Sequence, residues 1–247
     1  MPEVLGCGTG GVVTRNNGTV TKVLFNKSCF EHEVSILNHV FDVPHVVTML
    51  SNSPSDMQIT FVYEGDTLYD CRNVFCKDWE PIMHQVFVAV HFMHMRRIIH
   101  GDIKMENILV NERGTVKLCD FGHSRVLADD EVNTSTLTQL RGTLSYTCPE
   151  ILKGQRYNGF NADAWSVGVV LYCLVMDSFP FSAAAAGRPD YDFFIMLMSK
   201  GKVPSDALLD MWGHAISSMA EKTTPLFAET LNRLLQPEPW KRFRFAD

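Results

Sequence analysis

The sequence predicts an α+β fold of two lobes, a small antiparallel sheet lobe with one helix and a larger, mainly helical lobe. Residues 1–63 show β-branched alternation with short turns, which is the pattern of strands. From Glu64 onward, apolar residues recur mainly at helical spacing. The 247 residues, 46% of them apolar, suffice for two lobes that share a core. We therefore expect one bilobal domain over residues 1–247, divided into residues 1–63 and 64–247.

The composition excludes several classes of protein. Ordinary shares of apolar and charged residues rule out a disordered, collagen-like or coiled-coil chain. The net charge of −6 lacks the basic excess of a protein that wraps nucleic acid, so no nucleic-acid partner is expected. The seven cysteines are scattered without a CxxC pair, which favours reduced thiols over disulfides or a zinc site.

The sequence also predicts an intracellular protein without a membrane span. The amino terminus carries no basic stretch followed by a long apolar run, so no secretory signal is expected. The longest strongly apolar stretch, Trp165–Met176, has only twelve residues and is too short to span a bilayer. The residues indicate no particular oligomeric state.

The small lobe begins with a hairpin. Gly11–Arg15 and Thr19–Phe25 flank Asn16-Asn17-Gly18, where Asn-Gly suits the positive φ angles of a tight turn. Val46–Leu50 and Met57–Tyr63 are expected to complete the antiparallel sheet.

One helix interrupts these strands. Ser28 and Glu31 match a capping box, in which the hydroxyl and the carboxylate satisfy free amides at a helix start. We expect this helix to run to about Val40.

The large lobe is expected to be helical around two short strands. An apolar stripe at helical spacing predicts its first helix. A turn over Asn111–Gly114 separates the two strands. The stripe consists of Ile82, Val86, Ala89, Val90 and Met93, the strands are Ile108–Val110 and Val116–Cys119, and further helices are expected at Ala162–Met176, Tyr191–Lys200, Ala207–Ala220 and Pro225–Leu235.

A glycine-rich string opens the chain. Residues 5–13 read Leu-Gly-Cys-Gly-Thr-Gly-Gly-Val-Val, with the spacing G-x-G-x-x-G-x-V. Glycines let the backbone approach phosphates and point amides at them, although such a string is as often only a turn. A dinucleotide fingerprint is disfavoured because the glycines enter a hairpin instead of a helix.

Lys22 is the first charged candidate for a functional site. By the strand period of two it shares a face with Val20 and Leu24, where an unpaired ammonium group is costly. Glu33, one turn before Leu37 on the predicted helix, could supply a carboxylate partner. The alternative is that Lys22 faces solvent on an edge strand.

The stretch from Ile98 to Val110 concentrates polar residues before a strand. It carries Asp102, Lys104 and Asn107, and Asp120-Phe121-Gly122 follows thirteen residues after Asn107. Carboxylate and amide oxygens such as those of Asn107 and Asp120 are ligands that hard cations prefer. Asp102 could accept a hydroxyl proton. A purely structural role does not easily explain this order of polar residues at strand ends.

In this order the residues resemble the eukaryotic-type protein kinase family, and the resemblance covers nearly the whole chain. It implies a bilobal kinase fold. Cys148-Pro149-Glu150 is similar to the family's Ala-Pro-Glu element, and Asp163–Gly168 resembles the helix that anchors the catalytic loop. Arg242 resembles the arginine that pairs with Glu150.

The resemblance extends to the serine/threonine branch. Lys104, two residues after Asp102, is typical of that branch, as are Gly142-Thr143 and Tyr146 before the Cys-Pro-Glu element. The implied reaction transfers the γ-phosphoryl group of ATP to a serine or threonine hydroxyl of a protein substrate, with Mg²⁺ as the metal.

The resemblance assigns roles around ATP. The glycine-rich loop would cover the phosphates, Lys22 would hold the α and β groups, and Glu33 would orient Lys22. Val13 and Val20 would press on the adenine, and the backbone of Thr60 to Tyr63 would meet its edge. The implied nucleotide-binding residues are Leu5, Gly6, Cys7, Gly8, Thr9, Gly10, Gly11, Val12, Val13, Lys22 and Glu33.

The resemblance also assigns roles in the transfer step. Asn107 and Asp120 would bind the magnesium ions that bridge the phosphates, and Asp102 would orient the acceptor hydroxyl and accept its proton. Lys104 and Thr143 would support the γ-phosphate and the loop. The implied catalytic residues are Asp102, Lys104, Asn107 and Thr143, and the implied metal ligands are Asn107 and Asp120.

One departure from the family pattern concerns regulation. Gly101 stands where the family usually has an arginine that reads a phosphate on the activation segment. We therefore expect activity that is independent of phosphorylation in that segment. Asp129-Asp130-Glu131 in the same segment is a solvated charge run or, alternatively, a built-in activating element. The candidate phosphorylation sites are Thr134, Ser135, Thr136 and Thr138.

A second departure is the compact small lobe. Only ten residues separate Gly11 from Lys22, and ten more separate Lys22 from Glu33. Val20 replaces the usual alanine and narrows the adenine site. Compact kinases with glycine in the catalytic loop are similar to those encoded by large DNA viruses, which would place the protein in the cytoplasm or nucleus of a host cell.

Two functions from different classes fit the sequence. The first is an active serine/threonine kinase, and the alternative is a pseudokinase that binds nucleotide or a partner as a scaffold. Retention of five polar residues together favours the enzyme, because a scaffold needs no such set. These residues are Lys22, Glu33, Asp102, Asn107 and Asp120.

Overall fold

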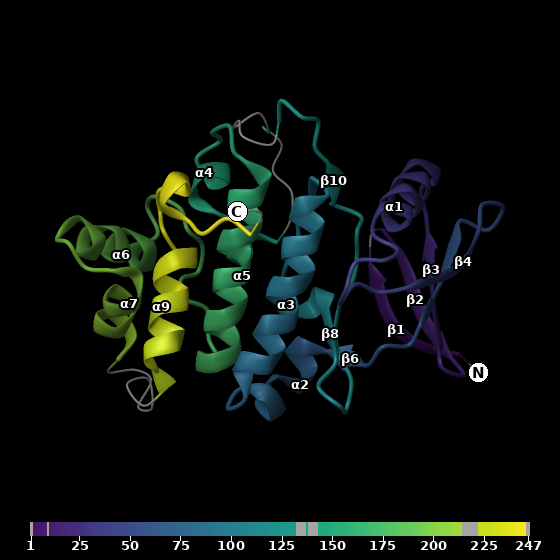
Figure 1. Ribbon diagram of the computed structural model, residues 1–247, viewed down its shortest axis with the longest axis horizontal. Helices are drawn as coiled ribbons and strands as arrows, with labels where there is room; N and C mark the ends of the chain where they lie inside the picture. Colours follow the sequence, from purple (N-terminus) through teal and green to yellow (C-terminus); the bar gives the residue numbers. More distant parts are fainter. Residues whose placement is uncertain (1, 9, 132–136, 138–142, 214–221, 246–247) are drawn as a thin grey trace.

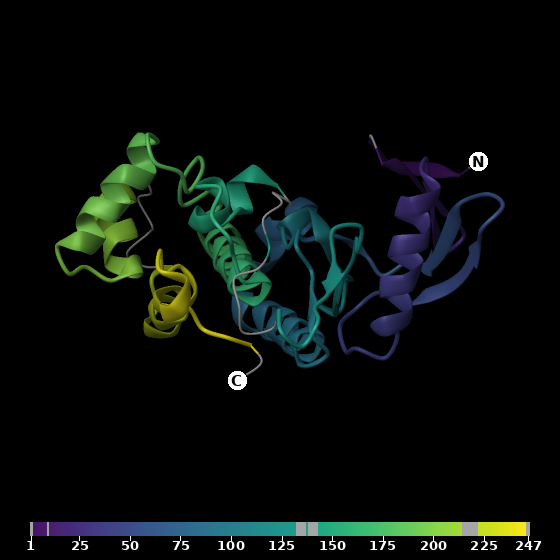
Figure 2. The same ribbon diagram turned by 90° about the horizontal axis from the view of Figure 1, so that it is seen from above.

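The computed structural model describes residues 2–8, 10–131, 137, 143–213 and 222–245. Figure 1 shows a sheet with one helix at the amino-terminal end and a bundle of helices at the other end, as the sequence predicts. The two lobes lie side by side along the longest axis, and Figure 2 shows the same division from above.

The amino-terminal lobe contains a five-stranded sheet in which each pair of neighbours is antiparallel, in the order β1-β2-β3-β5-β4. The hairpin between β2 and β3 turns at Asn17 and Gly18, whose φ angles are 45° and 81°. Positive φ at both central residues is what a type I′ turn requires, so the predicted hairpin is confirmed. The strands are β1 (Glu3–Gly8), β2 (Gly11–Asn16), β3 (Thr19–Leu24), β4 (Met49–Ser53) and β5 (Gln58–Val62).

Helix α1 (Lys27–His39) is capped by Asn26 and not by Ser28. The Asn26 side-chain oxygen accepts hydrogen bonds from the backbone amides of Ser28 at 2.8 Å and Cys29 at 3.3 Å. The Ser28 hydroxyl donates to the same oxygen at 2.7 Å, so it is already used. The predicted capping box is therefore wrong, because Asn26 lies just ahead of the helix and satisfies the free amides first.

The fourth strand is displaced from its predicted position. The sequence predicted a strand over Val46–Leu50, whereas β4 begins at Met49. Val46 instead forms a parallel bridge with Leu118 of the large lobe, and the Val47 amide donates to the Leu118 carbonyl at 3.0 Å. Both valines are buried. The apolar residues Val46 and Val47 therefore pack between the two lobes and do not belong to the five-stranded sheet.

The second lobe is mainly helical, as predicted. Asn158 caps α5 through its side chain, so this helix begins three residues before the predicted start at Ala162. Residues 214–220 of the helix predicted to end at Ala220 lie outside the described residues. The elements are β6 (Asp66–Thr67), α2 (Leu68–Phe75), α3 (Trp79–Met95), β7 (Ile98–Ile99), β8 (Ile108–Val110), β9 (Val116–Leu118), β10 (Arg125–Val126), α4 (Pro149–Leu152), α5 (Gly159–Met176), α6 (Pro189–Ser199), α7 (Pro204–Trp212) and α9 (Pro225–Leu234), with 3₁₀ turns at Met105–Asn107, Leu144–Tyr146 and Pro239–Lys241.

Helix α5 forms the centre of this lobe. It lies between α3 and α9 in Figure 1 and packs against both. By length and composition alone it could cross a membrane, with 18 residues and a mean hydropathy of 1.4. However, 83% of it is buried within the protein, as in the core helix of a globular domain.

A buried ion pair ties α4 to the carboxy-terminal end of the described chain. The Arg242 guanidinium donates to both carboxylate oxygens of Glu150, at 2.6 and 2.8 Å. It also donates to the carbonyls of Gln236, Asn161 and Pro237 and stacks over the Trp165 ring. Because each carboxylate oxygen of Glu150 and each guanidinium nitrogen of Arg242 has a hydrogen-bond partner, the cost of burying the two charges is offset.

Replacing Arg242 with alanine should strongly destabilise the protein. The Glu150 carboxylate would stay buried without its cation, which costs about 3–5 kcal/mol of the free energy of unfolding. Urea denaturation measures this loss, with Arg242→Lys as a control that keeps the charge but lacks the planar fork. A loss below about 1 kcal/mol in Arg242→Ala would contradict the role given to this pair.

Candidate active site

A cleft of about 260 Å³ separates the two lobes. One wall comes from β1, β2, β3, the end of β5 and the residues after it, and the other comes from the loops around β8 and β9. The side chains on its walls are mostly apolar, with a few charged groups at one end. Its lining residues are Leu5, Gly6, Val13, Val20, Lys22, Glu33, Val47, Phe61, Val62, Tyr63, Glu64, Gly65, Thr67, Glu106, Asn107, Leu109, Cys119 and Asp120.

Lys22 joins two carboxylates at the charged end of the cleft. Its ammonium group lies 2.7 and 2.8 Å from the two carboxylate oxygens of Glu33 on α1. It also lies 2.8 Å from Oδ1 of Asp120, which follows β9 in the other lobe. Glu33 is 1% exposed, so its carboxylate depends on this partner. The expected Lys22–Glu33 pair is confirmed, and the edge-strand alternative for Lys22 is wrong.

The pKa values of the three groups reflect burial and mutual attraction. Burial is the largest influence at Lys22 and lowers its pKa, but the Glu33 and Asp120 carboxylates outweigh it, so the pKa lies above its ordinary value. At Asp120 burial raises the pKa, but Lys22 outweighs it and the net pKa is lowered. At Glu33 burial outweighs Lys22, so the pKa is raised. Lys22 and Asp120 are therefore both charged at neutral pH.

Four protein donors surround the carboxylate of Asp102. Oδ1 accepts from the Thr143 amide at 2.8 Å and the Thr143 hydroxyl at 3.1 Å. Oδ2 accepts from Lys104 Nζ at 2.7 Å and from Asn107 Nδ2 at 3.1 Å. Lys104 Nζ also donates to the Thr143 hydroxyl at 2.9 Å. The four residues predicted to be catalytic therefore form one network.

The buried carboxylate of Asp163 on α5 holds the backbone of the loop that leads to Asp102. Its two oxygens accept from the amides of His100 and Gly101, both at 2.9 Å. His94 Nε2 on α3 lies 3.0 Å from Asp163 Oδ2. The expectation that the Asp163 segment anchors this loop is thus realised by two backbone hydrogen bonds.

His100 packs behind Phe121, with ring centroids 5.2 Å apart. Its Nε2 lies 3.0 Å from the Cys119 carbonyl, and its Nδ1 accepts from the Asp102 amide at 3.3 Å. Burial lowers the pKa of this imidazole. The neutral tautomer with the proton on Nε2 satisfies both contacts, so His100 supports the loop as an uncharged side chain.

Asn107 and Asp120 present oxygen donors to the cleft. Asn107 uses Nδ2 to donate to the backbone and side chain of Asp102, which directs its amide nitrogen toward the loop. Asp120 adopts φ = 63° and uses Oδ1 for Lys22. Among the residues that the structure describes, no three His, Cys, Asp or Glu side chains gather as a metal cluster. Two protein oxygens fit a cation such as Mg²⁺, which keeps water and takes its other ligands from substrate phosphates.

The glycine-rich string contributes only part of its length to the cleft wall. Leu5, Gly6 and Val13 line it. Cys7, Gly8, Gly10, Gly11 and Val12 lie in or beside the β1–β2 hairpin outside the lining residues, and Thr9 lies outside the described residues. Gly11 has a packing role, because a Cβ there would lie 2.2 Å from the Val23 carbonyl oxygen.

The expected adenine wall is shifted along the chain. Val13 and Val20 line the cleft as predicted. Thr60, whose backbone pairs with Thr21 and Ser51 in the sheet, is not among the lining residues. The wall begins at Phe61 and continues to Gly65. Phe61 and Val62 are the last residues of β5, and Tyr63, Glu64 and Gly65 follow the strand.

Several cleft residues carried no sequence signal. Val47 and Leu109 belong to ordinary apolar stretches, and Cys119 is a partly buried residue directly before Asp120. Burial raises the pKa of the Cys119 thiol to about 12, so the thiol is uncharged. Only their proximity in the sequence to Asp120 or to the predicted strand ends could have identified them as cleft residues.

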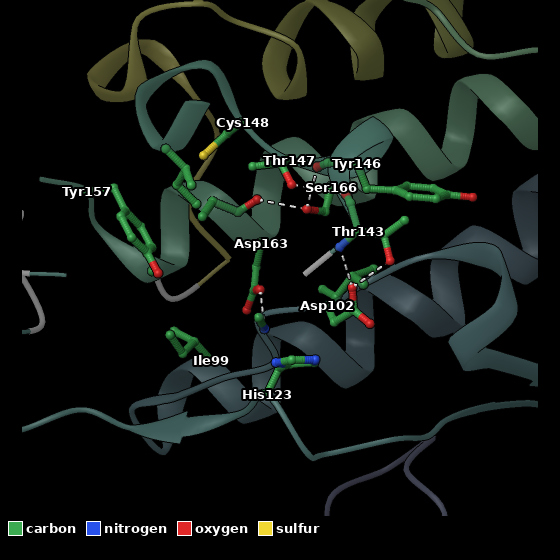
Figure 3. A pocket seen from close by; sticks show the side chains of 15 residues that line it. Ile99, Asp102, His123, Thr143, Tyr146, Thr147, Cys148, Tyr157, Asp163 and Ser166 are labelled. Carbon is green, nitrogen blue, oxygen red and sulfur yellow. Dashed lines mark hydrogen bonds between the residues drawn. The ribbon is translucent and has the colours of Figure 1, made fainter. Parts of the chain in front are cut away.

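A second, much smaller cavity of about 30 Å³ lies behind the catalytic loop (Figure 3). Gly101, His123 and Thr143 line it together with Asp163 and Ser166. It has room for about two water molecules. Gly101 adopts φ = 79°, and a Cβ there would lie 2.8 Å from the His123 carbonyl oxygen. The backbone at this position is therefore built for glycine.

The chain matches the protein kinase domain family over residues 4–246. It is 36% identical over 154 residues to a probable serine/threonine-protein kinase KIN1 homolog of Encephalitozoon cuniculi, which covers 60% of this chain and 26% of that protein. It is 31% identical over 210 residues to serine/threonine-protein kinase 36 of Pongo abelii, which covers 83% of this chain and 14% of that protein.

A third relative is NUAK family SNF1-like kinase 2 of Homo sapiens, 30% identical over 234 residues. The alignment covers 83% of this chain and 35% of that protein. The chain thus spans between 14% and 35% of the length of these three relatives.

The buried His100 should make stability fall as the solution is acidified. Its folded pKa lies below the usual 6.5, so the unfolded chain binds a proton first. The stability that neutral His100 contributes is present above pH 6.5 and is lost as pH falls toward the folded pKa. The melting temperature of wild type should therefore drop more steeply between about pH 6.5 and 5 than that of His100→Gln. Parallel curves for the two proteins would contradict burial of a neutral imidazole.

Proposed function

The chain belongs to the protein kinase family, and we propose that it transfers the γ-phosphoryl group of ATP to serine or threonine hydroxyls of protein substrates. The observation that carries this proposal is the contact of Lys22 with both Glu33 and Asp120. This contact places a cation, a buried carboxylate and a metal-ligand candidate at one end of an apolar cleft. Phosphoryl transfer depends mainly on such positioning and charge neutralisation.

The apolar part of the cleft is suited to an adenine ring. Val13 and Val20 would hold its faces, and the backbone of residues 61–65 would meet its edge. Lys22 would neutralise the α- and β-phosphates, and Glu33 would keep the ammonium group in place. Gly6 would bring backbone amides toward the phosphates. Cys7, Gly8 and Gly10, at the end of β1 and beside β2, would cover the phosphates.

Asn107 and Asp120 would hold Mg²⁺ at the phosphates. When bound, the ion would neutralise the charge that develops on the phosphate oxygens. Asp120 is prepared for this role because its pKa is lowered and the carboxylate is charged. Lys22, at 2.8 Å, keeps one of its oxygens oriented in the cleft.

Asp102 would orient the acceptor hydroxyl and take its proton. The Thr143 hydroxyl, 3.1 Å from Asp102 Oδ1, already shows how an alcohol donates to this carboxylate (Figure 3). Lys104 bridges Asp102 and Thr143 and would neutralise the transferred group. A scaffold needs neither this hydrogen-bond network nor metal ligands. Their joint presence therefore favours an active enzyme over a nucleotide-binding pseudokinase.

Three single substitutions should abolish transfer. Asp102→Asn removes the proton acceptor, Lys22→Met removes the phosphate cation and Asp120→Asn weakens the metal site. Each should lower kcat by about 10²–10⁴-fold in an assay with labelled ATP, Mg²⁺ and a generic protein substrate. Equal incorporation by wild type and Asp102→Asn, or none by either, would refute the enzyme. Full activity in Asp120→Asn would refute the metal assignment.

Transfer should not require phosphorylation of the activation segment. A variant with alanine at Thr134, Ser135, Thr136 and Thr138 should keep wild-type turnover, because Gly101 offers no arginine to bind a phosphate there. These four residues lie outside the described residues, so the prediction rests on Gly101. Turnover before and after phosphatase treatment provides the control. Loss of turnover in the variant would refute this independence.

A further inference from the structure

The segment after Asp120-Phe121-Gly122 is joined to the catalytic loop by backbone pairing. Strand β10 pairs with β7 through Arg125 and Ile99 and through Val126 and Ile98. The Leu127 amide extends this ribbon by donating to the Arg97 carbonyl at 2.7 Å. Because β7 leads directly into the loop that carries Asp102, the position of β10 affects the position of that loop.

The same segment also touches α1. Ser124 donates through its hydroxyl to the His100 carbonyl at 3.0 Å, and its own carbonyl lies 2.9 Å from His32 Nε2. His32 is the neighbour of Glu33, the partner of Lys22. Figure 1 shows β10 between the helical lobe and α1. Residues 124–126 therefore contact both the loop that carries Asp102 and helix α1, which carries Glu33.

Glu131 closes this stretch into a turn. Its Oε1 accepts from the guanidinium of Arg125, and its Oε2 accepts from the Ala128 amide at 2.9 Å. The Glu131 amide donates back to the Ala128 carbonyl at 3.0 Å. The side chain of Glu131 is only 16% exposed, so both carboxylate oxygens bind protein groups in a partly desolvated position. Charge-assisted hydrogen bonds of this kind are stronger than neutral ones.

A second carboxylate beside β10, that of Asp129, forms a weaker ion pair. Asp129 pairs with the guanidinium of Arg97, but its side chain is 90% exposed. Exposed ion pairs contribute little to stability. The two carboxylates cancel the charges of Arg97 and Arg125, while Gly101 supplies no third cation. A phosphate added at this place would meet carboxylates already bound to the arginines.

We propose that Glu131 is a positioning residue of the kinase reaction, holding Arg125 and β10 as a phosphate does in kinases that need activation-segment phosphorylation. The expected effect of Glu131 on catalysis rests on the proposed kinase function. Glu131 acts on Asp102 through Arg125, β10 and β7 and does not touch the substrates. The charge run at residues 129–131 is thus a built-in anchor and more than a solvated surface.

The test compares Glu131→Gln with Glu31→Gln. The first variant removes the charge but keeps an amide oxygen for Ala128, and the second makes the same change at the exposed Lys27–Glu31 pair of α1. Glu131→Gln should lower kcat about tenfold while the KM for ATP stays within about twofold, because the nucleotide cleft is untouched. Glu131→Asp should recover part of kcat, and Glu31→Gln should match wild type.

Two further readouts separate positioning from general loss of stability. Hydrogen exchange without nucleotide should become about tenfold faster at residues 98–102 and 125–128 in Glu131→Gln, with protection of α5 unchanged. Arg125→Gln should have the same effect, and the double variant should be no worse than either single one, because both remove one interaction.

The outcomes distinguish this inference from the proposed function. Exchange and kcat in Glu131→Gln that equal those of Glu31→Gln would overturn the role of Glu131. So would faster exchange throughout the chain, since that result indicates a merely structural residue. If wild type transfers no phosphoryl group, the proposed function fails, and faster exchange confined to residues 98–102 and 125–128 still supports the anchor.

Discussion

The ammonium group of Lys22 is the interaction on which the site depends. It lies within 2.8 Å of two carboxylates, one from α1 and one from the other lobe. Without that cation, Glu33 and Asp120 would face each other as like charges in a poorly solvated cleft, and one would have to take up a proton. Helix α1 and the backbone at Asp120, with its φ of 63°, thus bring two carboxylates to this single positive charge.

A second buried charge organises the catalytic loop in a different way. Within the described part of the chain, Asp163 is bound by two backbone amides and His94 instead of a lysine or an arginine. Backbone amides cannot move independently of the chain, so this carboxylate fixes the path from His100 to Gly101 directly. Asp102 is then positioned by a rigid helix, α5, and its carboxylate is free to bind side chains. The Asp102 carboxylate is therefore left to bind the side chains of Lys104, Asn107 and Thr143.

Local chemistry in the sequence predicted some features better than others. The turn at Asn17-Gly18 could be predicted because its conformation depends on these two residues alone. The Lys22–Glu33 ion pair could be predicted because a buried charge requires a partner. Asn26 was missed because Ser28 and Glu31 offered an equally good local pattern. Val46 and Val47 were misplaced for a different reason. Whether an apolar alternation joins a sheet or another lobe is decided by tertiary packing, which local sequence does not contain.

Gly101 connects the backbone and the charge balance of the activation segment. Its φ of 79° and the nearby His123 carbonyl favour glycine, so the loop avoids the strain that a larger residue would bear. The same glycine removes a cation that would need an anion. Arg97 and Arg125 already have the carboxylates of Asp129 and Glu131 as partners. A change that relaxes the backbone thus also removes a cation that could bind a phosphate, which links the shape of the loop to the independence from phosphorylation proposed above.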